Sequence, residues 1–172
     1  MTPVEGSVEL DIPVQELWHC FARADLWPRW NHCMFWARNR DLRAGDRLVW
    51  AFEPLRWWLP YKLPGAAQLV EVEKAHHVTW EVTMLPGFFA RHTYFMEDLG
   101  DGRTRFGSWE QAMGPTFRLL RPFWLAHFNF VLRESLQGAQ SLEQIYAHGD
   151  GLDVERMPRR TSTSSYFLLL LV

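Results

Sequence analysis

Residues 6–31, GSVELDIPVQELWHCFARADLWPRWN, contain the change of hydrophobic period that decides the fold. In residues 6–12 the apolar side chains occupy every second position, which is typical of a half-buried strand. Pro13 ends this strand and suits the first turn of a helix, and apolar residues then recur at helical spacing. Asp25 is a suitable cap for a second helical turn through LWPRW. The stretch predicts one strand followed by two short helices.

Six further strands are expected before the last helix, at residues 34–40, 47–53, 66–74, 77–84, 91–99 and 104–113. Their connections are short or rich in turn residues, which indicates an antiparallel meander. The stretch 54–64 holds three prolines and fits neither a long helix nor a central strand, so we expect a loop. Its adjacent Trp57 and Trp58 either cap the core or form a lid over a ligand.

After Gly114 and Pro115 the apolar period changes from two to about 3.6 and predicts a long amphipathic helix. A kink or restart is expected at Pro122. The residues on its apolar face are Phe117, Leu120, Trp124, Phe128, Val131, Ser135, Ala139, Leu142 and Tyr146.

Composition limits the function classes. The length of 172 residues predicts one folded core. The net charge of -2 leaves no excess of basic residues to neutralise a phosphate backbone, so nucleic acid is not an expected partner. Ten Trp and twelve Phe exceed what a small core needs, which favours a lined cavity or an adhesive surface. Cys20 and Cys33 each follow a histidine, but adjacent residues point apart and no Cys-x-x-Cys occurs. We therefore expect buried thiols in a reducing cytoplasm, and no metal or cofactor.

The predicted domain covers residues 1–148, and residues 149–172 are expected to form a flexible tail because their composition turns polar. The tail ends in FLLLLV, residues 167–172, which is too short to span a bilayer. Integral membrane association is therefore not expected. Docking of this end on the body, pairing in a weak homodimer and weak membrane contact all stay open.

Several motifs resemble the START-like or SRPBCC superfamily, in particular its polyketide cyclase/dehydratase and lipid-transport branch. They are VELDIPVQELWHCFARADLWPRWN (8–31), LRAGDRLVW (42–50), HVTWEV (77–82), YFMEDLGDGRTRF (94–106) and Gly114. The likeness covers about residues 6–146. It implies an α+β helix-grip fold, in which a curved seven-stranded antiparallel sheet wraps the C-terminal helix and leaves a deep cavity. Members of the superfamily carry sterols, phospholipids, quinones, plant hormones or polyketides there.

The family pattern suggests that Tyr94 and Met96 face this cavity, and His92 then shares their face because alternate strand residues do so. On the next strand Phe106, Ser108 and Glu110 share one face. His92, Tyr94 and Glu110 are candidate catalytic residues, an acid/base group able to enolise or dehydrate a poly-β-ketone. In the alternative interpretation they are hydrogen-bonded wall residues that orient a ligand.

The ligand-binding candidates are Trp30, Asn31, Trp36, Trp50, Trp58, Trp80, Met96, Phe106, Ser108, Trp124, His127 and Phe128. His127 either points into the cavity or is a satisfied core histidine, and His76 and His77 are interpreted as a solvated turn. Two hypotheses follow. The chain binds, and so carries or sequesters, a hydrophobic aromatic or polycyclic small molecule; alternatively, it is a polyketide cyclase/dehydratase.

Overall fold

The computed structural model describes residues 3–53, 61–83, 86–149, 151–157 and 166–167 and contains the expected curved antiparallel sheet. Its strands are β1 (Val4–Leu10), β2 (Met34–Arg38), β3 (Arg47–Phe52), β4 (Tyr61–Glu73), β5 (His77–Val82), β6 (Phe89–Gly100) and β7 (Arg103–Met113). Their order is β1-β7-β6-β5-β4-β3-β2. Strands β2 to β7 therefore form a meander, and β1 joins it beside β7.

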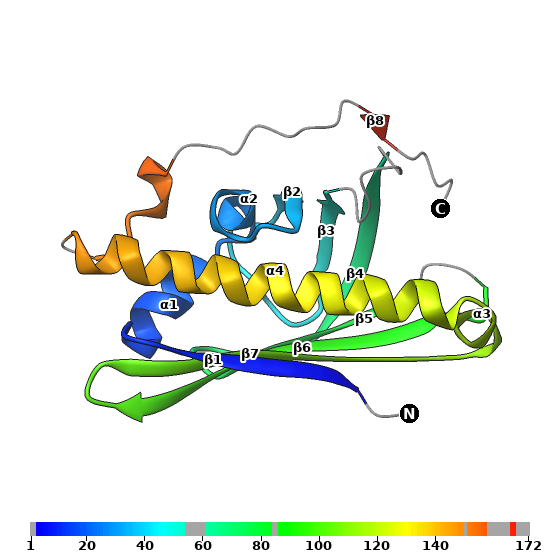
Figure 1. The fold of residues 1–172 in the computed structure, drawn as a ribbon, viewed down its shortest axis with the longest axis horizontal. Helices are drawn as coiled ribbons and strands as arrows, with labels where there is room; N and C mark the ends of the chain where they lie inside the picture. The colour runs from blue at the N-terminus through cyan, green and yellow to red at the C-terminus, as the bar shows by residue number, and fades with distance from the viewer. Residues whose placement is uncertain (1–2, 54–60, 84–85, 150, 158–165, 168–172) are drawn as a thin grey trace.

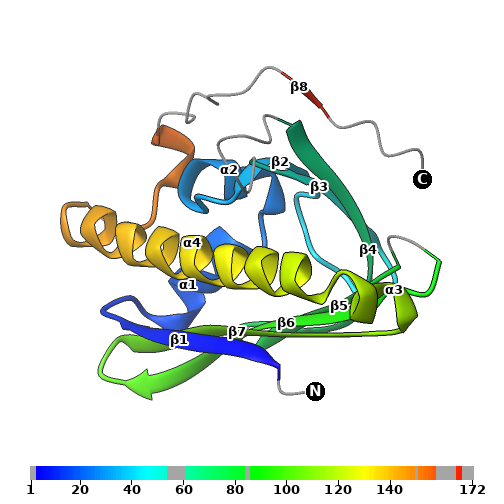
Figure 2. The same ribbon diagram turned by 45° about the vertical axis from the view of Figure 1, so that its right-hand side comes forward.

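The helices occupy the positions that the sequence predicts. They are α1 (Val14–Phe21), the 3₁₀ turn η1 (Ala24–Leu26), α2 (Trp27–Trp30), α3 (Pro115–Leu119) and α4 (Arg121–Ala147). Pro122 lies in the first turn of α4, where its missing N–H costs nothing, so the helix restarts there as expected. Figures 1 and 2 show α4 crossing the sheet, with β1, β7 and β6 on one side and α2, β2 and β3 on the other. This is the α+β helix-grip fold.

Two local predictions are wrong. Residues 61–64 belong to β4 instead of a loop, and Pro64 is tolerated because this part of β4 pairs with β3 whereas β5 pairs only from Gln68 onward. Leu120 is 41% exposed because it lies at the junction of α3 and α4, outside the helical period. Trp57 and Trp58 lie outside the described residues.

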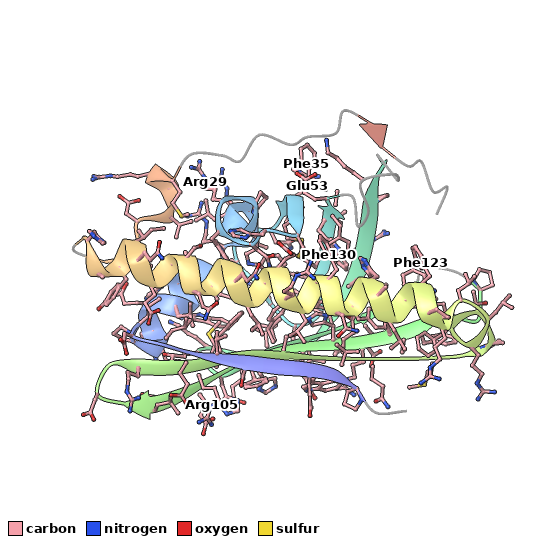
Figure 3. The ribbon with its side chains drawn as sticks, viewed as in Figure 1. Arg29, Phe35, Glu53, Arg105, Phe123 and Phe130 are labelled. Atoms are coloured by element: carbon pink, nitrogen blue, oxygen red, sulfur yellow. The ribbon has the colours of Figure 1, made fainter. Side chains whose placement is uncertain are left out.

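Part of the expected flexible tail packs on the body. Val154, in the 3₁₀ turn η2 (Val154–Arg156), is 2% exposed and belongs to the core cluster. Arg29 donates hydrogen bonds to the carbonyl oxygens of Glu155 and Met157, and Figure 3 shows Arg29 beside this segment. Further on, β8 (Tyr166–Phe167) pairs in parallel with the start of β4. The domain boundary at residue 148 stays a prediction.

Helix α4 passes very close to the end of α2. A Cβ atom at Gly138 would lie 2.3 Å from the carbonyl oxygen of Trp30 and 3.0 Å from the Cα of Asn31. Both neighbours are backbone atoms, which cannot rotate away. The contact therefore requires glycine, although glycine is a poor helix former.

We expect Gly138→Ala to destabilise the protein by about 1–3 kcal/mol, because displacing α4 outweighs the gain in helix propensity of about 1 kcal/mol. Chemical denaturation measures the difference. Gln137→Ala, at the exposed neighbouring position, is the control and should change the free energy of unfolding by no more than about 0.5 kcal/mol. An alanine variant as stable as the parent would contradict the close packing.

We expect a chain that ends at residue 148 to unfold cooperatively but to lose about 1–3 kcal/mol, because it lacks the buried Val154. The seven antiparallel strands and α4 all end before that point. A chain that ends at residue 157 should keep this contribution, and Val154→Ala in the full chain should lose about 1–2 kcal/mol. Non-cooperative melting of the shorter chain would show that the body depends on residues 149–172.

Candidate functional site

A cavity lies between the concave face of the sheet and α4. Its lining residues are Met34, Trp50, Phe52, Trp80, Val82, Phe88, Ala90, His92, Tyr94, Glu110, Trp124, His127, Phe128 and Val131. The free space is about 30 Å³, which is room for one or two water molecules. The resemblance implies a deep cavity, whereas in this structure aromatic side chains occupy most of the gap. A larger ligand requires these side chains to move.

Strand register brings the predicted acid/base residues together. His92 lies opposite Glu110, Tyr94 opposite Ser108 and Met96 opposite Phe106 in the β6–β7 pair. Directly opposed residues point to the same face of a sheet, so all six side chains share the concave face. The parity argument from the sequence therefore holds for this pair of strands.

Trp50 reaches the cavity because β4 has a glycine beneath its indole ring. A Cβ atom at Gly65 would lie 2.6 Å from that ring. The indole of Trp50 then packs between Phe52 and Trp80, with ring centroids 5.8 Å and 6.2 Å away. Gly65 thus positions one aromatic wall of the cavity.

A buried hydrogen-bond network joins the sheet, α2 and α4. The Tyr94 hydroxyl lies 2.7 Å from Ser135 Oγ, and Asn31 Nδ2 donates to the same Oγ at 3.0 Å. The thiol of Cys33 donates to Asn31 Oδ1 at 3.0 Å. Burial raises the pKa of Tyr94 and raises that of Cys33 to about 12, so both groups keep their protons at neutral pH.

His92 is held on three sides. Its Nδ1 lies 3.2 Å from Glu110 Oε2, its Nε2 lies 2.9 Å from Ser108 Oγ, and its ring stacks on Trp80 with a centroid distance of 4.7 Å. A carboxylate only accepts hydrogen bonds, so a neutral imidazole carries its proton on Nδ1 and receives the Ser108 hydroxyl proton at Nε2. This arrangement orients the ring and leaves Nε2 as the basic atom.

His127 enters the cavity from α4 and is 6% exposed. Its ring lies edge-on to Phe52 at 4.9 Å and to Trp124 at 5.9 Å. Burial lowers the pKa of His127, and the nearby charges of Glu110 and His92 act in opposite directions on it. The imidazole is therefore neutral at pH 7. Within the described part of the chain, three buried wall atoms have no hydrogen-bond partner: His127 Nδ1, Trp50 Nε1 and Trp124 Nε1.

Four of the other ligand-binding candidates are described and lie away from this cavity: Trp30, Trp36, Met96 and Phe106. Trp30, Met96 and Phe106 are buried core residues. Phe106 stacks on the Tyr94 ring at 5.5 Å, and the Trp30 ring lies 6.4 Å from that of Phe106. Trp36 is 44% exposed because a β-bulge between Met34 and Trp36 turns it to the outer face. Trp58 lies outside the described residues.

Ser108 lies one contact behind the wall, since it bonds His92. Asn31 lies two contacts behind it, since it bonds Ser135, which in turn bonds Tyr94. Trp80 and Phe128 line the cavity as expected.

Sequence reasoning missed several wall residues and two members of the network. They are Met34, Phe52, Val82, Phe88, Ala90 and Val131 on the wall, and Cys33 and Ser135 in the network. The strand parity of Val82 with Trp80 and the apolar face that holds Val131 and Ser135 were usable signals. Phe88 follows a Pro-Gly turn, where no periodic signal exists.

The fold is shared with solved structures of low sequence identity. A protein of Nitrosomonas europaea is 18% identical, with a TM-score of 0.59, covering 84% of this chain and 97% of that one. The di-domain ARO/CYC protein BexL, from the BE-7585A biosynthetic pathway, is 13% identical, with a TM-score of 0.64, covering 87% of this chain and 48% of that one. Truncated norcoclaurine synthase of Thalictrum flavum is 13% identical, with a TM-score of 0.52 and coverages of 77% and 91%.

No helix among the described residues is both long and apolar enough to cross a membrane. A search of curated proteins gave no match to the sequence. The family described as polyketide cyclase / dehydrase and lipid transport matches residues 1–145. This match covers most of the 172 residues and agrees with the helix-grip fold, so the chain belongs to the polyketide cyclase / dehydrase and lipid transport family.

Proposed function

We propose that this chain binds, and so carries or sequesters, a hydrophobic small molecule of aromatic or polycyclic shape between the sheet and α4. The observation that supports this most is the aromatic wall with three unpartnered polar atoms: Trp50 Nε1, Trp124 Nε1 and His127 Nδ1. An unpaired buried polar atom costs about 1–3 kcal/mol, and a ligand that pairs with it recovers this cost. Trp30 Nε1 in the core is also unpaired, but only the three wall atoms belong to residues that line the free space.

The chemistry of these atoms defines the ligand further. An indole N–H only donates, so Trp50 and Trp124 require hydrogen-bond acceptors. The neutral imidazole of His127 supplies either a donor or an acceptor according to its tautomer. A flat apolar body with carbonyl or hydroxyl oxygens at its edge satisfies the rings and the polar atoms together.

Entry of such a ligand requires space beyond the present 30 Å³. We expect this space to open at the junction of α3 and α4, because the helix is interrupted there. The wall residues Phe88, Trp124 and Phe128 lie next to this junction, and Phe128 stacks on Phe117 of α3. Exposed apolar side chains at this end include Phe89, Met113 and Leu119. Outward displacement of α3 exposes the aromatic wall without breaking the sheet.

A second function, polyketide cyclase or dehydratase, is favoured by one specific observation. His92 and Glu110 form a buried pair on the cavity wall, and Tyr94 adds a protonated hydroxyl beside them. Once the Ser108 hydroxyl no longer donates to His92 Nε2, this nitrogen can accept a proton from a substrate carbon next to a carbonyl group. The Tyr94 hydroxyl already bonds Ser135, however, which fits a fixed wall group better than a mobile acid.

Binding is expected to change tryptophan fluorescence and to raise the melting temperature when sterols, quinones, fatty acids or aromatic polyketides are screened. A ligand at 100 times its dissociation constant adds about 2.7 kcal/mol of stability. Trp124→Phe keeps the ring but removes the indole donor, so affinity should fall about fivefold. Trp36→Phe, on the outer face, is the matched control and should bind normally. If neither signal moves across the whole screen, the binding proposal is wrong.

The two functions respond differently to His92→Ala and Tyr94→Phe. A cyclase should lose turnover by about a hundredfold or more while binding changes little, since acid/base groups act mainly in the transition state. A carrier should only lose affinity, by about 1 kcal/mol per missing hydrogen bond.

The control is Glu97→Gln, because Glu97 lies on the outer face of the same strand and pairs with Arg105. Figure 3 shows Arg105 on the side of the sheet away from α4. The cyclase alternative is dropped if purified protein leaves the spontaneous cyclisation of a poly-β-ketone unchanged.

A further inference from the structure

Three side chains of types that bind metal ions converge on the turn between β4 and β5, and none of them lines the cavity described above. They are Glu73, His76 and His77. The two Nδ1 atoms lie 2.9 Å apart, and Glu73 Oε2 lies 3.5 Å from each of them. The sequence predicts only a solvated turn here, because the two histidines lie between two predicted strands.

The turn geometry is what brings them together. Glu73 and His77 are directly opposed across the β4–β5 pair. The His76 N–H donates to the Glu73 carbonyl oxygen at 3.0 Å, and the Met96 N–H donates to the His76 carbonyl oxygen at 2.6 Å. Ala75, with a φ of 59°, takes the left-handed conformation that folds His76 back toward Glu73. The backbone of all three ligands is therefore fixed from two neighbouring strands.

The three atoms have the spacing that a metal ion needs. The point equidistant from them lies about 1.9 Å from each, slightly inside the about 2.0–2.1 Å of zinc–nitrogen and zinc–oxygen bonds. An ion displaced by less than about 1 Å from their plane reaches this bond length to all three. Its remaining position faces solvent, since the Glu73 and His76 side chains are 65% and 64% exposed.

A second carboxylate lies on the far side of His77. Glu71 Oε2 is 3.6 Å from His77 Nε2, and Arg91 Nη2 is 3.5 Å from the same oxygen. A carboxylate at Nε2 favours the tautomer that carries its proton there, so the Nδ1 lone pair of His77 accepts a hydrogen bond from His76 Nδ1 in the metal-free protein. A metal ion that binds both Nδ1 atoms displaces that proton. Metal-ligating histidines commonly have such a carboxylate at their second nitrogen.

We propose that Glu73, His76 and His77 bind one divalent transition metal ion, with Glu71 as a positioning residue for His77. Two imidazole nitrogens and one carboxylate oxygen suit Zn²⁺, Ni²⁺ and Cu²⁺, and they disfavour Mg²⁺ and Ca²⁺, which prefer all-oxygen sites. Water fills the open position. The site is separate from the hydrophobic cavity and does not depend on the function proposed for it.

The test is titration of the full chain with Zn²⁺ by calorimetry, and with Co²⁺ by visible absorption. One equivalent should bind, and His76→Ala should weaken binding at least about tenfold. His76 is exposed, so this variant should keep the melting temperature of the metal-free protein. Glu71→Gln should weaken binding by about tenfold through the orientation of His77. His19→Ala, which removes another exposed histidine, is the matched control and should bind as the parent does.

Nitrogen NMR of the imidazoles separates the proposed geometry from adventitious binding. Coordination through Nδ1 of both His76 and His77 supports the site. The proposal is overturned if the two rings coordinate through Nε2, if His76→Ala and His77→Ala bind Zn²⁺ as tightly as the parent, or if His19→Ala weakens binding as much as they do.

Discussion

The hydrogen bond between Tyr94 and Ser135 connects the sheet to the long helix, and the geometry of the site depends on it. Both groups are almost fully buried, so removing either partner would leave the other polar group unpaired, at a cost of about 1–3 kcal/mol. Asn31 extends the network to the end of α2, and Gly138, one turn beyond Ser135, lets α4 approach that backbone. The centre of α4 is thereby fixed against both layers, and the remaining gap lies toward its N-terminal half.

The periodicity of the sequence predicted the strands and helices because it reports which face of each element is buried, and the family resemblance supplied their helix-grip arrangement. Strand parity placed His92 with Tyr94 on one strand and Ser108 with Glu110 on the next, and the observed register puts both pairs on one face. The helical period placed Trp124, Phe128 and Ser135 on the apolar face of the last helix. Parity fails where the backbone adds a residue, and the β-bulge in β2 turned Trp36 outward. A bulge leaves no pattern in a single sequence.

The volume of the cavity was beyond prediction for a different reason. The surplus of aromatic residues indicated a lined space, but the same rings either surround a ligand or fill the gap themselves according to how they pack. Here Trp50, Trp80 and Trp124 contact neighbouring rings closely, and little free volume remains. The composition predicts that the wall is aromatic, but the side-chain rotamers determine how much free volume remains. The rotamers depend on contacts between strands that are far apart in the sequence.

The histidines show how neighbours decide the chemistry of one residue type. His92 is oriented by Glu110 and Ser108, which set the roles of both its ring nitrogens. His127 is kept neutral by burial, and its Nδ1 has no hydrogen-bond partner, so its tautomer is not set by its neighbours. His76 and His77 lie at the solvent edge, where an ion can reach them without desolvating the core. Sequence distance distinguishes none of these environments, because each is created by tertiary contacts. Strand pairing brings a carboxylate beside His92 and His77, and the packing of α4 on β3 brings the Phe52 ring beside His127.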